Sequence, residues 1–143
     1  MAKIKGNDIR LYIESATPAT FNVIKGETGH TVNRQASQID TTSKDDGAYG
    51  TSMPGSRALS ISLTVIPDLP DATGLERLLT VANATPQVAT KFQRRKSPYA
   101  IGDVIMEGEF FVADIGDAAN QNQPHEATIT LVAAKAPSQD DLT

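Results

Sequence analysis

The 143-residue sequence contains no cysteine and no tryptophan, and aromatic residues make up only 5% of it. Without cysteine the chain has no disulfide, no thiolate metal ligand and no cysteine nucleophile. No apolar run approaches the roughly 20 residues that a membrane helix needs, and the opening stretch MAKIKGNDIRLYIE lacks the apolar core of a secretion signal. We therefore expect a protein that is neither secreted nor membrane-bound, made in a reducing cytoplasm.

The charge balance argues against a general nucleic-acid binder. The chain has 13 lysines and arginines against 17 aspartates and glutamates, for a net charge of −4. Affinity for nucleic acid comes mainly from cations that neutralise phosphates, although DNA can still slide past an acidic surface. The length fits one domain, so we expect residues 1–143 to fold as a single unit.

Alternation of apolar and polar residues predicts a mostly β chain. Residues 58–66 place Leu59, Ile61, Leu63 and Val65 on one face and Ser60, Ser62 and Thr64 on the other. Residues 9–13 and 127–131 show the same period of two. Further strand candidates are 21–25, 30–34, 87–92 and 104–115, the last with a candidate break at Gly108.

One helix is predicted at about residues 72–84. Its apolar stripe consists of Leu75, Leu78, Leu79 and Ala82. Thr73 and Glu76 match a capping box at its start, and Asp71 is the alternative N-cap. An amphipathic helix needs an apolar surface to cover, so the expected fold is a β-sandwich or partly open barrel with one flanking α-helix. The polar tail at about 135–143 is expected to be mobile.

No pattern recommends an enzyme, a cofactor or a resident metal. The carboxylates of Asp40, Asp45 and Asp46 precede Gly47 as in a calcium loop, but that register puts Lys44 at a position that needs an oxygen ligand. His30 and His125 are the only histidines, and a metal-dependent enzyme would require both to converge with carboxylates. We expect them instead at the surface or at strand ends.

A short basic cluster lies in the segment KFQRRKSPY. It consists of Lys91, Arg94, Arg95 and Lys96, with Phe92 and Tyr99 alongside. Such a mixture occurs in nucleic-acid sites, but a run this short more often forms a solvated strand end or one side of a salt-bridged contact. We expect these residues to contact a neighbouring subunit rather than DNA.

A long polar segment at about residues 40–57 precedes the clearest strand. Loops longer than about 12 to 15 residues are uncommon in compact domains and are usually functional or disordered. Within IDTTSKDDGAYGTSMPGSRALSISLTVI the distinctive residues are Asp40, Thr42, Ser43, Lys44, Asp45, Asp46, Tyr49, Pro54, Gly55 and Arg57. Its length and polarity therefore predict a loop that does more than connect two strands.

The same run resembles siphophage major tail proteins, in which an I/V-D-x-T-S-K-D element leads through a glycine-rich loop to Pro-Gly and a serine-alternating strand. The opening GNDIRLYIE strand, the mid-chain helix and the closing ATITLVAA strand extend the resemblance. It implies a β-sandwich with a flanking helix that forms hexameric rings, stacked into the tail tube through which DNA passes transiently. With that resemblance, we expect the loop at about 40–57 to reach beyond its own subunit and to order against an adjacent ring. It also implies a place in the virion and partners such as tape measure and tail terminator or tip proteins.

A small β-sandwich binding module for carbohydrate or host recognition is the alternative function. Such modules usually display aromatic side chains for sugar stacking, whereas this chain has no Trp, three Tyr and four Phe. The scarcity of aromatic residues therefore favours the self-assembling structural protein.

Overall fold

The computed structural model describes residues 5–68 and 70–140, with the side chain of Asp46 excepted. The eight strands are β1 (Ile9–Glu14), β2 (Phe21–Val23), β3 (Glu27–Asp40), β4 (Ser52–Val65), β5 (Thr90–Lys96), β6 (Val104–Ala118), β7 (Glu126–Ala133) and β8 (Gln139–Asp140). The single α-helix is α1 (Leu75–Ala82), and short 3-10 turns occupy Gly6–Asp8, Lys44–Asp46 and Ile101–Asp103. The expected class, mainly β with one flanking helix, is confirmed.

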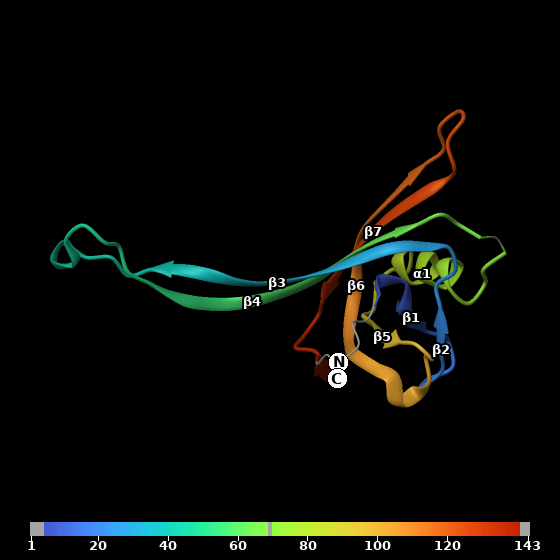
Figure 1. The fold of residues 1–143 in the computed structure, drawn as a ribbon, viewed down its shortest axis with the longest axis horizontal. Helices are drawn as coiled ribbons and strands as arrows, with labels where there is room; N and C mark the ends of the chain where they lie inside the picture. Colours follow the sequence, from blue (N-terminus) through green and yellow to red (C-terminus); the bar gives the residue numbers. More distant parts are fainter. Residues whose placement is uncertain (1–4, 69, 141–143) are drawn as a thin grey trace.

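All strands belong to one antiparallel sheet with the order β2-β1-β5-β6-β7-β4-β3. Strand β6 is long enough to pair with β5 along its first half and with β7 along its second half. The sheet bends around a core without closing, and two hairpins project from the body, β3–β4 far to one side and β6–β7 at an angle to it (Figure 1). The fold is therefore a partly open barrel with two extensions.

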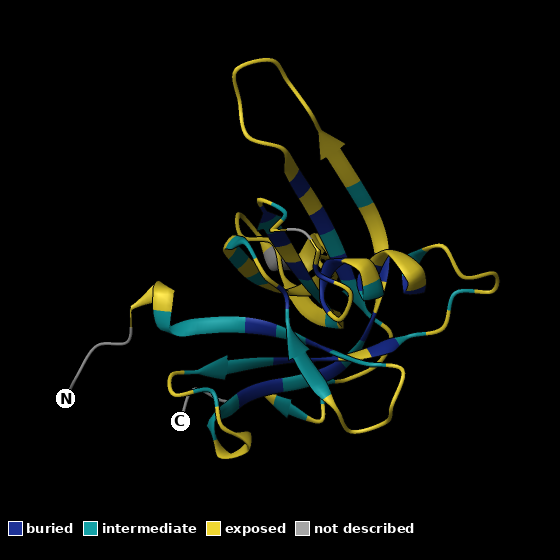
Figure 2. Cartoon of the chain, turned by 90° about the vertical axis from the view of Figure 1, so that its right-hand side faces the viewer, coloured by how far each residue is buried: buried dark blue, intermediate teal, exposed yellow. Residues whose placement is uncertain are grey.

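The core lies inside the bend of the sheet. Its fully buried side chains include Leu11, Ile13, Ile24, Ile61, Leu63, Phe92, Met106, Phe110, Ile129 and Leu131. Phe92 and Phe110 meet edge to face, with ring centroids 6.0 Å apart. Buried residues gather in the body, whereas the end of the β6–β7 hairpin is exposed (Figure 2). The predicted inward face of β4 is confirmed for Ile61, Leu63 and Val65, and Leu59 packs partly buried against the same core.

Helix α1 covers one side of the core, but with a stripe that differs from the predicted one. Leu75, Leu78 and Val81 are buried, whereas Leu79 is 37% exposed. The eight-residue helix is also shorter than predicted. So short a helix has only about two turns, and three side chains spaced three residues apart suffice to cover the core. The prediction that Leu79 belongs to the buried stripe was therefore wrong.

Asp71 organises the start of the helix, as the alternative cap predicted. Its Oδ2 accepts hydrogen bonds from the backbone N–H of Leu75 and of Lys25, each at 3.1 Å. The side chain is almost fully buried. One carboxylate thus ties α1 to the turn between β2 and β3, and the Thr73–Glu76 capping box is not what the structure uses.

Two predicted irregular regions are regular in the structure. The loop expected at 40–57 is strand at both ends, because β3 continues to Asp40 and β4 begins at Ser52. The tail expected to be mobile from 135 instead adds β8 to the edge of β6, and Lys135 pairs with Glu109 at 3.1 Å. Residues 141–143 of that tail lie outside the described residues. Gly108 stays within β6, whose register shifts fall between Val104 and Met106 and between Val112 and Asp114 instead.

Leu63→Ala should lower the free energy of unfolding by about 2 to 5 kcal/mol, because it leaves a cavity in the core. Leu79→Ala removes the same atoms from a partly exposed position and should cost much less. The denaturant midpoints of the two variants check this. Equal midpoints would contradict the assigned faces of β4 and α1.

Candidate assembly interface

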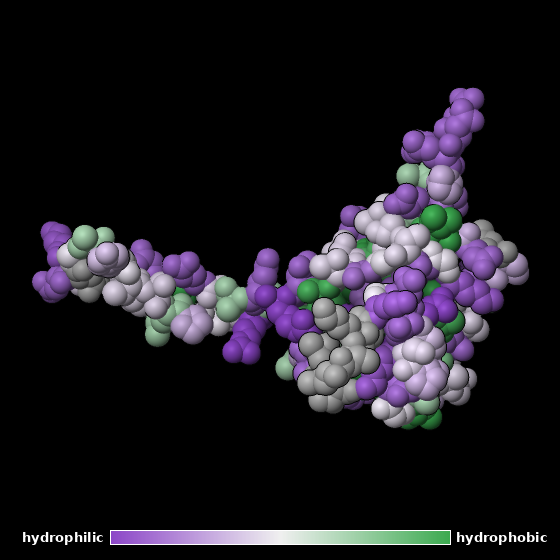
Figure 3. Space-filling view, viewed as in Figure 1, coloured by the Kyte–Doolittle hydropathy of each residue, from purple (hydrophilic) through white to green (hydrophobic). Residues whose placement is uncertain are grey.

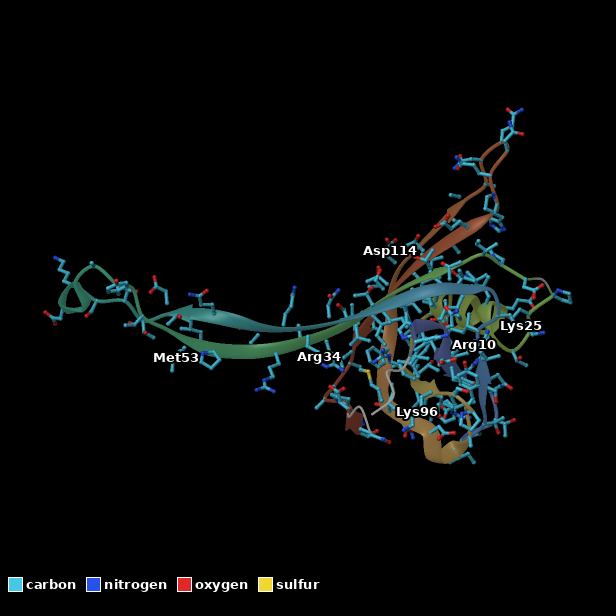
Figure 4. All side chains as sticks on the ribbon, in the orientation of Figure 1. Arg10, Lys25, Arg34, Met53, Lys96 and Asp114 are labelled. Carbon is cyan, nitrogen blue, oxygen red and sulfur yellow. The ribbon has the colours of Figure 1, made fainter. Side chains whose placement is uncertain are left out.

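The β3–β4 hairpin continues well beyond the body. Strand β4 pairs with β7 only from Ser60 to Val65, whereas its pairing with β3 runs on to Asp40 and Ser52. We call residues 35–58, which include the tip at 41–51, the arm. Every arm residue with a described side chain is exposed except Gly55, which is half-buried. In Figure 4 Arg34 marks the root of the arm and Met53 lies far along it.

The arm is a strand pair that no core supports. Its side chains show no apolar and polar alternation because neither face is buried, and backbone pairing alone continues the ladder. Between Ala36–Arg57 and Gln38–Pro54 the register shifts by one residue, so Gly55 and Ser56 form a bulge opposite Ser37. A Cβ on Gly55 would lie 2.3 Å from Ser37 Oγ, so this close approach requires glycine.

Hydroxyl groups close the tip of the arm. Thr42 Oγ1 donates to the carbonyl of Thr51 at 3.1 Å and accepts from the Thr51 N–H at 2.8 Å. Asp40 Oδ1 accepts from the Thr42 N–H at 2.9 Å, and hydrogen bonding from the hydroxyl and backbone of Thr42 lowers the pKa of Asp40. Ser43 Oγ accepts from the Asp45 N–H at 3.3 Å. The tip therefore has a defined shape of its own.

The structure distributes the predicted assembly residues along this arm. Asp40 and Arg57 belong to its two strands, as do Pro54 and Gly55. Thr42, Ser43, Lys44 and Asp45 belong to the tip, and so does the backbone of Asp46, whose side chain lies outside the described part. Tyr49 is 85% exposed, the highest value among the exposed large apolar side chains of the described residues.

Apolar side chains on the arm have no core to enter. Ile39 and Met53 face each other across the ladder and are 48% and 50% exposed. Figure 3 shows the arm as a mixture of polar and pale green residues that stands apart from the body. Exposed apolar groups on an extension are typical of a surface that becomes buried on association.

The predicted basic cluster divides between the two faces of β5. Arg95 contacts residues of its own chain. Its Nη2 donates to Gln93 Oε1 at 2.8 Å, and its guanidinium lies 4.6 Å from the centroid of the Tyr12 ring. Arg94 points to the other side, where its Nε donates to His30 Nε2 at 2.9 Å. Lys91 is exposed and Lys96 is half-buried. The four cations therefore do not form one patch.

A buried polar bridge joins β1, β3 and β5 at the opening of the sheet. The side chains of Glu27 and His30 are each 5% exposed and form an ion pair or hydrogen bond through Nδ1 and Oε1. Glu27 Oε2 accepts the N–H of Leu11 at 3.1 Å. Because His30 Nε2 accepts from Arg94, the ring is held as the neutral tautomer with its proton on Nδ1. Sequence reasoning missed this bridge and placed His30 at the surface or a strand end.

A second charged contact lies at the root of the arm. Arg34 donates to Asp140 from Nε at 2.9 Å and from Nη2 at 2.5 Å, joining β3 to β8. The contact lowers the pKa of Asp140 and raises that of Arg34. Bidentate geometry restricts the direction in which the arm leaves the body.

The two histidines do not meet. His125 pairs with Asp117 in the exposed β6–β7 hairpin, whereas the His30 bridge joins β1, β3 and β5. Within residues 5–68 and 70–140 no group of three potential metal ligands occurs. In the same part of the chain no helix is long and apolar enough to cross a membrane.

Comparison with known proteins decides which family this architecture represents. The sequence profile of the phage tail tube proteins matches residues 3–139. The chain belongs to the phage tail tube protein family. A search among curated protein sequences found no significant match.

Solved structures share the fold of this tail tube family member. The tail of an empty gene transfer agent particle with C6 symmetry superimposes with a TM-score of 0.76 at 20% identity, over 96% of this chain and 98% of that one. The SPP1 tail tube superimposes with a TM-score of 0.71 at 14% identity, over 99% of this chain and 81% of that one. A chain from the virion of a native gene transfer agent superimposes with a TM-score of 0.73 at 21% identity, over 95% of this chain and 98% of that one.

Asp140→Asn tests the contact at the root of the arm. A carboxyl whose pKa is lowered in the folded state contributes stability above its ordinary value near 3.9, and that contribution disappears as the pH falls through the folded value. At neutral pH and low salt the variant should be less stable by up to about 1 kcal/mol, since solvent reaches both side chains. Denaturation at pH 7 and below pH 4 should show the difference shrinking in acid. An undiminished difference in acid would contradict the ion-pair account.

Proposed function

We propose that this chain forms hexameric rings that stack into a phage tail tube, the conduit for DNA delivery. The observation that carries the proposal is the arm: two 14-residue strands extend past the core and expose Ile39, Tyr49 and Met53 to solvent. An extension of this kind gains stability only by contact with another molecule. Family membership and the C6 symmetry of a similar tail support the choice of further copies as that molecule.

Ring formation requires contacts between the sides of subunits. Strand β3 is an edge of the sheet, so along its outer side backbone N–H and C=O groups have no strand partner among the described residues. Unpaired edges invite pairing with another chain, and a repeated head-to-tail contact closes into a ring when the rotation allows it. We propose that the body forms the ring and the arm reaches to the adjacent ring.

The convex face of β3, β4, β7 and β6 suits the lining of a DNA channel. Successive rows across these strands are Asn33, Ser60, Val132 and Phe111, then Thr31, Ser62, Thr130 and Asp114, then Gly29, Thr64, Thr128 and Gly116. These rows contain mostly small polar groups, the apolar Val132 and Phe111, one carboxylate and no lysine or arginine. A channel without cations lets a polyanion slide because nothing neutralises and holds its phosphates.

The remaining partners follow from the tube. A stacked tube has two ends, which tail terminator and tip proteins would cover, and a lumen that a tape measure protein would occupy before DNA. A structural subunit of this kind needs no catalytic group or cofactor, and we propose that the chain is not an enzyme. A carbohydrate-binding module is less well supported, because Tyr49 stands at an arm tip without a second exposed aromatic residue beside it to build a stacking platform.

Shortening the arm should separate ring assembly from stacking. Replacing residues 38–54 with a two-residue Asn-Gly turn removes the tip and leaves the pairing of β4 with β7 untouched. The variant should fold with near-normal stability and form rings, but its tubes should fail to grow at concentrations where the unaltered protein polymerises. Electron microscopy with sedimentation measures both.

A matched control shortens the other projecting hairpin. Replacing residues 119–124 between β6 and β7 removes an exposed polar turn of the described chain. That variant should retain tube growth. The proposed function would be overturned by unaltered protein that remains monomeric at high concentration, or by normal tubes from the arm-shortened variant.

Ser62→Lys tests the channel face. Six added lysines around one lumen would surround DNA with positive charge, whereas Thr80→Lys places the same charge on exposed α1. Preformed Ser62→Lys tubes should retain short DNA in co-sedimentation at low salt and release it at high salt, and Thr80→Lys tubes should not. Equal retention by both variants would show that the β4 face does not line the channel.

A further inference from the structure

A cavity of about 490 Å³ opens on the body, away from the arm tip. Its walls come from the turn before β1, from Arg10, from the start of β3, and from Arg94 and Tyr99. The Glu27–His30 pair forms part of the wall. The cavity is therefore polar, and its chemistry is set by a few charged side chains.

Positive charge is in excess in this cavity, although the whole protein is acidic. Two arginines, Arg10 and Arg94, line it, against one carboxylate. The side chain of Arg10 forms no hydrogen bond or ion pair with any residue that the structure describes. The one carboxylate of the lining, Glu27, is already engaged by His30 and by the N–H of Leu11.

Arg94 adds unused donors. Within the described chain its guanidinium makes a single hydrogen bond, to the neutral ring of His30. Burial and the nearby charge of Arg34 lower the pKa of Arg94 despite the attraction of Asp140 and Glu27. Arg94 lines the open cavity and forms no ion pair with a carboxylate of the described residues, so its remaining N–H groups can donate to an anion that enters there.

The arm tip carries the complementary charge. Residues 41–51 contain two aspartates, Asp45 and Asp46, and one lysine, and a third aspartate, Asp40, ends the adjoining strand β3. The Asp45 side chain is exposed. The hydrogen bond of this residue to Ser43 Oγ comes from its backbone N–H and leaves the carboxylate available. Since the arm extends away from the body, the tip does not reach the cavity of its own subunit (Figure 1).

We propose that the cavity beside Arg10 and Arg94 receives the acidic arm tip of a second copy of this chain. The proposal deepens the function proposed above and rests on it: acidic tip and basic cavity form a head-to-tail contact, which repeats without closing and so propagates a stack. Complementary charges at such a contact fix its register and raise the association rate.

Introduced cysteines test the contact directly, because the chain has none of its own. The double variant Asn7→Cys with Lys44→Cys puts one thiol at the cavity and one at the tip, and keeps Arg10 and Asp45. Under mild oxidation it should give disulfide-linked dimers and higher ladders. The control Asn120→Cys with Lys44→Cys moves the first thiol to the β6–β7 turn and should give far fewer.

Charge reversal tests whether charge drives the contact. Arg10→Glu and Asp45→Arg should each raise the critical concentration for tube growth about tenfold or more, since every subunit loses a pair. The two changes combined should restore growth toward the unaltered level. Lys25→Glu, exposed and outside the cavity, should have little effect.

The outcomes separate this contact from the proposed function. If unaltered protein forms tubes but the Asn7–Lys44 variant forms no more disulfide than its control, the cavity assignment is overturned and the tube function stands. If the Arg10→Glu and Asp45→Arg changes combined do not restore tube growth, the cavity assignment is likewise overturned. If unaltered protein forms no tubes but the specific disulfide appears, the head-to-tail contact stands and the tube function fails.

Discussion

The structure depends on one continuous backbone ladder, the pairing of β3 with β4. Inside the body this ladder is supported by Ile61, Leu63 and Val65, whose burial in the core fixes the register. Beyond Leu59 the same hydrogen bonds continue without any apolar support. The core therefore holds the arm by its root and fixes its register, because the two strands cannot shift without moving buried residues to the surface.

Polar contacts determine how that root sits on the rest of the sheet. The Glu27–His30–Arg94 bridge joins β3 to β1 and β5, which are distant in the strand order, and Arg34 with Asp140 joins β3 to β8. The buried Glu27–His30 pair contributes more to a unique arrangement than to net stability, whereas the Arg34–Asp140 pair is solvent-accessible. In a protein that repeats itself along a tube, a fixed angle between body and arm is a functional requirement, because any error accumulates from ring to ring.

The sequence predicted the parts of the fold that burial shapes. The alternation of Leu59 to Val65 identified the inner half of β4 because one face of that half is buried. The outer half was missed since Pro54 and Gly55 are usual breakers and no burial imposes a pattern there. The contact of His30 with Arg94 left no local signal, because the two residues are 64 positions apart. The family resemblance described residues 40–57 as a loop, whereas β3 and β4 continue as a strand pair to Asp40 and Ser52; the role of this segment in assembly stays a prediction.

Hydrogen exchange of the arm in free and assembled protein tests the central claim most directly, that the arm is built for contact between subunits. In the free subunit the amides of residues 35–40 that are not bonded to β4 should exchange rapidly, as should those of the tip. In tubes both groups should become strongly protected, while amides of Ile61 and Leu63 stay protected in both states. Equal exchange of the arm in free and assembled protein would contradict the account.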